Sequence, residues 1–212
     1  DIDLFIKNNL VDERKVFKID GIGVDTNYFS PSLPVISPIS FIFVGRLLLE
    51  KGIEDFIDAA KIIHKKFQHV HFYVAGGLDF NPGSITENQL LTFKKISFIT
   101  FLGEVDDIRS VLLKSSVFVL PSYREGLPRS TIEAMSMEKP IITTDVPGCR
   151  QTVIDGLNGF IVDVRNPIAL ANAMEKFVTN SQLIVEMGQQ SRNIAVNRFK
   201  DTIINDRLVE LF

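Results

Sequence analysis

The chain has 212 residues, of which 45% are hydrophobic and 23% charged, as in an ordinary globular protein of one large or two small domains. Its formal net charge of -3 gives no reason to expect binding to nucleic acid or electrostatic capture by an anionic membrane. The single cysteine, Cys149, excludes an internal disulfide, which fits a reducing compartment, and no apolar run approaches the roughly 18 to 20 residues that span a bilayer.

Strand and helix patterns alternate along the chain. Short apolar runs predict buried strands, and apolar residues three and four apart predict the helices that pack on them. The predicted elements are a helix within 1–13, a strand at 15–19, a loop rich in Gly and Pro over 21–40, a strand at 41–44, a helix at 53–67, a strand at 70–75, a helix at 86–96, a strand at 97–102, a helix at 106–114, a strand at 117–120, a helix at 129–137, strands at 140–144 and 159–162, and helices at 167–179, 181–196 and 200–211. This alternation predicts an α/β fold with a doubly wound parallel sheet.

The most informative stretch is Pro121-Ser-Tyr-Arg-Glu-Gly-Leu-Pro-Arg-Ser-Thr-Ile-Glu133. It places Glu125 in the loop after a buried strand and Glu133 on the next helix, with Pro128 expected at the first helical position. In open α/β sheets, ligands bind at the carboxyl ends of the strands, and a helix start suits a phosphate. Carboxylates would repel a phosphate, so this pair suggests a ligand that also carries hydroxyl groups. The alternative is that Glu125 caps the helix and Glu133 is an exposed surface residue.

Two cations follow the strand at 41–44, in the stretch that runs from Gly45-Arg46 to Lys51-Gly52. An arginine can grip a phosphate with two parallel hydrogen bonds, and a lysine supplies a mobile point charge. The spacing does not fit a P-loop, and no Ser or Thr follows the lysine. The alternative is a solvated turn with ordinary surface charges.

Other candidate sites carry weaker signals. The stretches 145–150 and 155–159 are expected to be turns at strand ends, and no histidine near Cys149 in sequence could activate it as a nucleophile. His69 and His71 would share a strand face, but no cysteine or carboxylate accompanies them, so a metal site is not expected there.

Taken as a set, these stretches resemble the retaining glycosyltransferases of the GT-B fold, in the large family four. The resemblance covers most of the chain, about residues 16–178. The segments that carry it, by order and spacing, are 41–47, 50–52, 102–105, 120–128, 133–135, 139–148 and 155–160. In detail the chain is similar to the bacterial subgroup that builds polysaccharide or lipid-linked oligosaccharide from UDP-sugars.

The resemblance implies an enzyme of two Rossmann-like domains, of which the first binds the acceptor and the second the nucleotide sugar. Residues 1–212 are then expected to be the donor domain, including the carboxy-terminal helices from about 181, with the acceptor domain absent, which agrees with the first residue being Asp1 rather than Met. The isolated domain is expected to bind nucleotide but to be inactive. The full-length enzyme would transfer a hexosyl or N-acetylhexosaminyl group, with retention, to a glycan or lipid-linked acceptor. It would work in the cytoplasm, with any peripheral membrane association at the inner face through the missing half.

The same resemblance assigns roles to individual residues. Arg46 and Lys51 would bind the donor diphosphate and stabilise charge on the leaving UDP, and Glu125 would contact the donor sugar near the scissile bond. Glu133 would accept hydrogen bonds from the ribose hydroxyls. The remaining expected contacts to the nucleotide sugar come from Gly45, Glu104, Val105 and the backbone N–H groups of Gly126, Leu127 and Arg129, with Glu104 and Val105 bordering the base. No metal or other cofactor is implied, and the UDP-sugar is a substrate.

One residue departs from the family pattern. Glu138 stands where the family usually has glycine at the end of the motif helix, and a glycine there would allow a left-handed cap. A glutamate adds negative charge at a negative dipole end, at a cost of a few tenths of a kcal/mol. Gly23, in a variable loop, is a further candidate for contact with the donor.

Two other functions are compatible with this fold. A GT-B-type sugar-nucleotide epimerase would share the two-domain architecture, but its acid/base residues are not found here. A non-catalytic module that binds nucleotide sugar is the other alternative, and intact Arg46, Lys51, Glu125 and Glu133 weigh against it.

Overall fold

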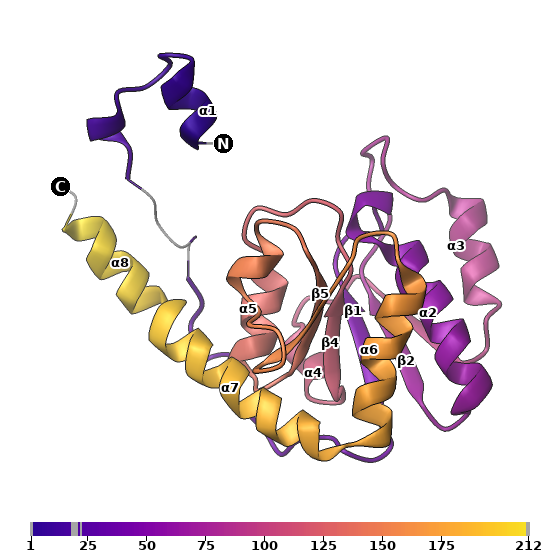
Figure 1. Ribbon diagram of the computed structural model, residues 1–212. Coiled ribbons are helices and arrows are strands. Elements are labelled where there is room, and N and C mark those ends of the chain that lie inside the picture. Colours follow the sequence, from indigo (N-terminus) through magenta and orange to yellow (C-terminus); the bar gives the residue numbers. More distant parts are fainter. Residues whose placement is uncertain (1, 18–20, 22, 211–212) are drawn as a thin grey trace.

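A parallel sheet forms the centre of the chain, for which a computed structural model describes residues 2–17, 21 and 23–210 (Figure 1). The sheet has six strands in the order β3-β2-β1-β4-β5-β6, and every neighbouring pair is parallel. The strands are β1 (Ser40–Val44), β2 (His71–Ala75), β3 (Ile99–Gly103), β4 (Val117–Leu120), β5 (Ile141–Thr144) and β6 (Gly159–Val162). This arrangement confirms the predicted doubly wound fold, and the strand order reverses between β1 and β4, where such sheets bind ligands.

Helices cover both faces of the sheet. The α-helices are α1 (Ile2–Lys7), α2 (Ile53–Lys66), α3 (Glu87–Lys94), α4 (Arg109–Leu112), α5 (Arg129–Ser136), α6 (Pro167–Thr179), α7 (Gln182–Arg198) and α8 (Asp201–Val209), and the 3-10 helices are η1 (Glu13–Lys15), η2 (Leu49–Lys51) and η3 (Cys149–Gln151). Helices α2 and α6 pack against each other on one face, and α5 packs against α7 on the other, as Figure 1 shows. The central strands β1 and β4 are therefore buried along their whole length, as their uninterrupted apolar sequences predict.

Local signals fix where several helices begin. The side chain of Asn166 accepts a hydrogen bond from the N–H of Ala169, and Pro167 occupies the first turn of α6. Thr86 and Gln89 form a reciprocal capping box at the start of α3. At α5 the prediction is wrong by one residue, because Pro128 is the extended N-cap and Arg129 is the first helical residue.

The predicted strand at 15–19 is wrong where the structure describes it. Residues 13–15 form the 3-10 helix η1, residues 16 and 17 belong to no strand, and residues 18 and 19 lie outside the described part of the chain. The carboxylate of Asp12 accepts a hydrogen bond from the N–H of Arg14, which stabilises the tight turn. Although apolar and polar residues alternate in this segment, its described residues pair with no strand of the sheet.

The loop at 23–29 is held across the carboxyl ends of the strands by the carboxy-terminal helices. The N–H of Val24 donates to the carbonyl of Phe199 at 2.8 Å, and the N–H of Asp201 donates to the carbonyl of Val24 at 3.0 Å. Gly23 has a φ of +75°, and a Cβ there would lie 2.6 Å from the Cα of Asp201. Glycine is therefore required for the loop to reach the junction of α7 and α8.

A left-handed cap ends α5 even though glycine is absent. Glu138 has a φ of 58°, and its N–H donates to the carbonyl of Met135 at 3.1 Å. The N–H of Lys139 donates to the carbonyl of Ala134 at 3.0 Å, which completes a Schellman motif. The sequence put the local cap in doubt because glutamate replaces glycine at this position, but the cap forms and Glu138 carries the backbone strain.

Glu138→Gly is expected to be more stable than Glu138→Ala by about 1 kcal/mol, since only glycine adopts this conformation without strain. Both variants lose the attraction between Glu138 and Lys139, whose pKa burial lowers to about 8 against the opposing effect of Glu138. The comparison therefore isolates the backbone term. Urea denaturation of both variants measures the difference, and equal free energies of unfolding would contradict the account of the cap.

Candidate active site

Two cavities open beside the carboxyl ends of β1, β2 and β3. The first, the α5 cavity, has a volume of about 530 Å³ and is lined by residues of the loop at 23–29, by Arg129 and Glu133 of α5, and by Asp201 of α8. The second, the β1 cavity, has a volume of about 330 Å³ and is lined by residues that end or follow β1, β2 and β3. Asp106 and Ile108 belong to both walls, so the two cavities adjoin.

The β1 cavity contains four of the predicted site residues, Gly45, Arg46, Glu104 and Val105. Close backbone packing brings them together, because a Cβ on Gly76 would lie 1.9 Å from the carbonyl oxygen of Gly45. Arg46 is not free: its Nη1 lies 2.8 Å from a carboxylate oxygen of Asp79, while 60% of its side chain is exposed. The hydrogen bond from Arg46 lowers the pKa of Asp79. Sequence reasoning missed Asp79, which lies 33 residues from its partner.

The α5 cavity contains three more of the predicted residues, Gly23, Arg129 and Glu133. Only 11% of the Glu133 side chain is exposed, so its interpretation as a surface residue is wrong. Burial raises the pKa of Glu133, and the hydrogen bond from Arg129 Nε to Oε1, 2.9 Å long, opposes that effect. The backbone N–H groups of Arg129 and Ser130 have no acceptor within the described residues. A buried carboxylate in the cavity wall thus lies one helical turn from the free backbone donors at the start of α5.

Lys51 and Glu125 form a largely buried ion pair. Lys51 Nζ lies 2.5 Å from Glu125 Oε1, and Ser122 Oγ donates to the same oxygen at 2.9 Å. The exposed fractions of the two side chains are 19% and 9%, and neither residue lines the two cavities. The helix-cap interpretation of Glu125 is wrong, since α5 has no side-chain cap.

Glycine at position 52 makes this pairing possible. Gly52 has a φ of +73°, and a Cβ there would lie 2.0 Å from the carbonyl oxygen of Pro121. The N–H of Tyr123 donates to the carbonyl of Glu50 at 2.7 Å. The loop before α2 is therefore held against the loop after β4, which brings Lys51 to Glu125 across 74 residues of sequence.

Gly126 and Leu127 lie outside both cavities. Gly126 is exposed, and its carbonyl lies against Gly148 of the turn after β5. Leu127 packs against Gly21, so close that a Cβ on Gly21 would lie 2.6 Å from its Cδ2. The structure thus brings Arg129 and Glu133 to one cavity and Gly45, Arg46, Glu104 and Val105 to the adjoining one, with the Lys51–Glu125 pair separate from both.

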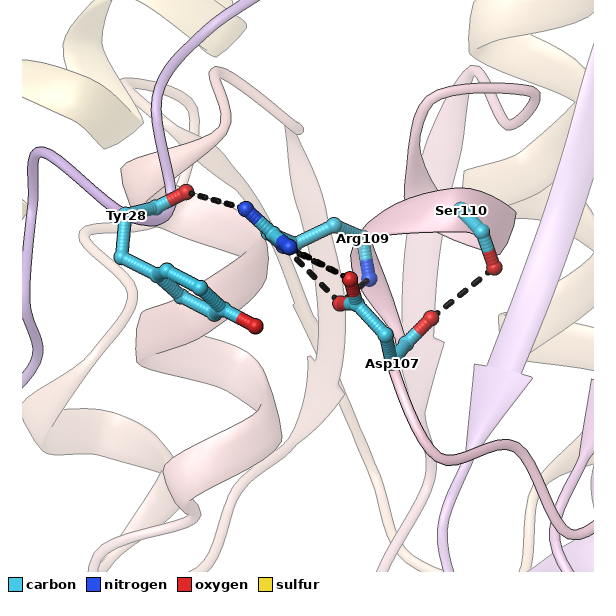
Figure 2. A network of polar contacts seen from close by, with 4 residues as sticks. All are labelled: Tyr28, Asp107, Arg109 and Ser110. Atoms are coloured by element: carbon cyan, nitrogen blue, oxygen red, sulfur yellow. Dashed lines mark hydrogen bonds and ion pairs between the residues drawn. The ribbon is translucent and has the colours of Figure 1, made fainter.

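A polar network that includes two residues of the α5 cavity wall, Tyr28 and Asp107, was missed by sequence reasoning. Figure 2 shows Arg109 between Tyr28 and Asp107, with its guanidinium 3.6 Å from the centroid of the Tyr28 ring. Arg109 donates to the Tyr28 carbonyl at 3.4 Å and to the carboxylate of Asp107 at 2.6 Å, which lowers the pKa of Asp107. Ser110 Oγ donates to the Asp107 carbonyl at 2.9 Å. The network ties the loop at 23–29 to the start of α4, and nothing in sequence spacing indicates it.

The described residues contain neither a metal-binding cluster nor a membrane-spanning helix. In residues 2–17, 21 and 23–210, no three His, Cys, Asp or Glu side chains gather in a way that could hold a metal ion. No helix of the described chain combines the length and the apolar character needed to cross a membrane.

Residues 28–194 match the protein-family model described as "Glycosyl transferases group 1". The chain belongs to this family. Two relatives are 30% identical to this group 1 domain: the capsular polysaccharide biosynthesis glycosyltransferase CapM of Staphylococcus aureus, over 98% of the chain, and the UDP-Gal:alpha-D-GlcNAc-diphosphoundecaprenol alpha-1,3-galactosyltransferase of Escherichia coli, over 100%. The group 1 domain spans 57% of the length of each.

A solved structure agrees with this family. The crystal structure of Anabaena Alr3699/HepE in complex with UDP and glucose superposes on 89% of the group 1 domain with a TM-score of 0.78 and 23% identity, and 54% of that chain is covered. The likeness shows the fold, which is a Rossmann-like half of the GT-B type. The predicted resemblance to a GT-B domain of the family-four type is therefore confirmed.

The pH dependence of stability is expected to change in Glu133→Gln. Because burial raises the pKa of Glu133 above its unfolded value, the folded chain favours the protonated form. The stability that this group contributes is present below its unfolded pKa and is lost as the pH rises through its folded pKa. Relative to the wild type, Glu133→Gln should therefore gain stability as the pH rises above the unfolded pKa of a glutamate, about 4.3, toward the raised pKa of Glu133 in the folded chain. Arg129→Gln should steepen the wild-type dependence, since Arg129 lowers this pKa. Urea denaturation across this range is the measurement, and a constant difference would refute the account.

Proposed function

We propose that this chain is the donor-binding half of a glycosyltransferase that transfers a sugar from a UDP-sugar, with retention, to a glycan or lipid-linked acceptor in bacterial surface polysaccharide synthesis. The observation that carries the proposal is the buried carboxylate of Glu133 in the wall of the α5 cavity, beside free N–H groups at the start of α5. A carboxylate accepts hydrogen bonds from ribose hydroxyls, and a helix start binds phosphate. A nucleoside diphosphate offers both groups in one ligand.

The charges of the site suit such a ligand. Two of the carboxylates expected to meet the donor have a cation beside them, Lys51 for Glu125 and Arg129 for Glu133. These cations offset the repulsion that a carboxylate would exert on a diphosphate. In this arrangement Glu104 and Val105 border the base, Arg46 and the start of α5 bind the diphosphate, and Glu125 contacts the sugar.

Transfer would depend on stabilising the leaving group. Negative charge develops on the diphosphate as the bond to the sugar breaks, and fixed cations and N–H donors aimed at it lower the barrier. Arg46, Lys51 and the amino end of α5 supply these groups, so the proposed reaction requires no metal. The transferred group would be a hexosyl or N-acetylhexosaminyl unit.

The names of the relatives support the substrate classes. The Escherichia coli relative is named for UDP-Gal and a diphosphoundecaprenol-linked acceptor, CapM for capsular polysaccharide, and the Anabaena structure contains UDP and glucose. Since the chain spans 57% of these relatives, we infer that the acceptor site lies on the remaining half. We also propose that the full-length enzyme acts in the cytoplasm, at the inner face of the membrane.

Calorimetric titration of the chain with UDP, GDP and ADP, first without and then with Mg²⁺, tests the donor assignment. We expect binding that prefers UDP and does not depend on the metal. Equal binding of all three nucleotides would contradict the preference for uridine. A requirement for Mg²⁺ would contradict the proposal that binding needs no metal. Absence of binding would overturn the proposed donor-binding role of this chain. For the full-length enzyme, NMR of the product tests retention, and an inverted anomer would contradict it.

A further inference from the structure

Arg129 holds more hydrogen-bonding capacity than its contact with Glu133 uses. Its Nε donates to Glu133 Oε1, while its terminal nitrogens Nη1 and Nη2 have no acceptor within the described part of the chain. The side chain is 64% exposed and lines the α5 cavity. An exposed guanidinium with a free fork of donors is suited to bidentate binding of a phosphate.

Arg129 also lies at the amino end of α5, where the helix dipole gives a positive electrostatic potential. It is the first residue of α5, and its own N–H and that of Ser130 have no acceptor among the described residues. Ser130 Oγ donates to the carbonyl of Val44 at 3.4 Å, which ties the start of α5 to the end of β1, directly before Gly45 and Arg46. A diphosphate at this helix end would meet backbone donors and the Arg129 side chain together.

The pair with Glu133 competes with a ribose for one of the two carboxylate oxygens. Arg129 Nε occupies Glu133 Oε1, an oxygen on which a hydroxyl group would donate. We propose that Arg129 exchanges partners when the donor binds: its guanidinium leaves Glu133 for the diphosphate, and the ribose hydroxyls take its place on the carboxylate. This inference rests on the proposed function and adds the Arg129 side chain to its diphosphate site.

The exchange leaves no buried charge without a partner in either state. In the free chain Arg129 satisfies the carboxylate of Glu133, and in the complex the ribose hydroxyls do so. The side chain of Arg129 is 64% exposed, so its guanidinium can move from the carboxylate to a bound diphosphate without itself becoming buried. Occupation of the ribose position and of the phosphate position is therefore coupled through one side chain.

Binding of uridine and of UDP to the 212-residue chain separates the two halves of this exchange. In Arg129→Gln the affinity for UDP should fall roughly 10- to 100-fold, because a charge-assisted bidentate contact is lost. The affinity for uridine should not fall, because Glu133 is freed from its competitor. Arg14→Gln is the matched control: it removes the same charge and breaks an exposed pair with Asp12 that lies outside both cavities, and it should leave both affinities unchanged.

A second background tests whether Arg129 contacts phosphate directly. In Glu133→Gln, adding Arg129→Gln should still weaken UDP relative to uridine by a similar factor. If Arg129 only positioned Glu133, Arg129→Gln would have no effect on affinity in the Glu133→Gln background. In the wild-type background it would then lower the affinities for uridine and UDP equally. Either result overturns the proposal. Unchanged UDP affinity in Arg129→Gln overturns it while leaving the proposed function intact. A wild-type chain that binds no UDP removes the proposed function and this inference with it.

Discussion

Gly148→Ala is expected to destabilise the chain by about 3 kcal/mol, toward the upper end of what overpacking costs. A Cβ at this position would lie 1.6 Å from the carbonyl oxygen of Gly126 and 2.5 Å from that of Glu125. Gly148 itself has helical dihedrals, φ -72° and ψ -37°, which alanine adopts readily. The expected cost is therefore steric, and it is relieved only if the turn at Gly148 moves away from the loop that carries Glu125 and Gly126.

Gly126→Ala is the matched control, because a Cβ on Gly126 would have no heavy atom within 4 Å. For Gly148→Ala a thermal scan should show a melting temperature lower by roughly 6 to 12 °C, given about 3 kcal/mol in a domain of this size. The control should stay within about 2 °C of the wild type. Equal melting temperatures for the two variants would show that the turn after β5 does not support the Glu125 loop.

The elements of the sheet were predictable because each depends on a local signal. Apolar runs such as Phe41 to Val44 are buried wherever they are placed in a parallel sheet, and helix α6 begins at Pro167 because Asn166 caps it. The strand at 15–19 was wrong because alternation over a few residues has meaning only when a neighbouring strand exists. The motif stretches were correctly placed at the carboxyl ends of the strands. Alternating strands and helices predict a parallel sheet, and the loops that follow parallel strands all lie at the same edge.

Most pairings within the site could not be predicted, since they join residues far apart in sequence. Arg109 meets the Tyr28 carbonyl across 81 residues, and Lys51 meets Glu125 across 74, contacts that depend on strand order and on the close approach at Gly52. Arg129 and Glu133 are the exception. They stand four residues apart on a helix, a spacing that by itself indicates an ion pair.

Lys51→Met should have the largest combined effect, on stability and on turnover of the full-length enzyme. It removes the cation from a carboxylate that is only 9% exposed and leaves Ser122 as its one described hydrogen-bond donor. Breaking a buried pair in this way typically costs about 3 to 5 kcal/mol. Glu125→Gln should cost less, because Lys51 is more exposed than its partner and can reach water.

The double variant Lys51→Met with Glu125→Gln separates folding from chemistry. Without a buried charge it should recover most of the free energy of unfolding lost in Lys51→Met, since neutral side chains often replace a buried pair at little cost. Turnover should not recover, because the cation that we propose stabilises the leaving diphosphate is still absent, and a loss of roughly 100- to 1,000-fold should remain. Urea denaturation and a sugar-transfer assay on the same four proteins form the double-mutant cycle. A double variant that regained both stability and turnover would show that the pair is structural and that neither residue takes part in transfer.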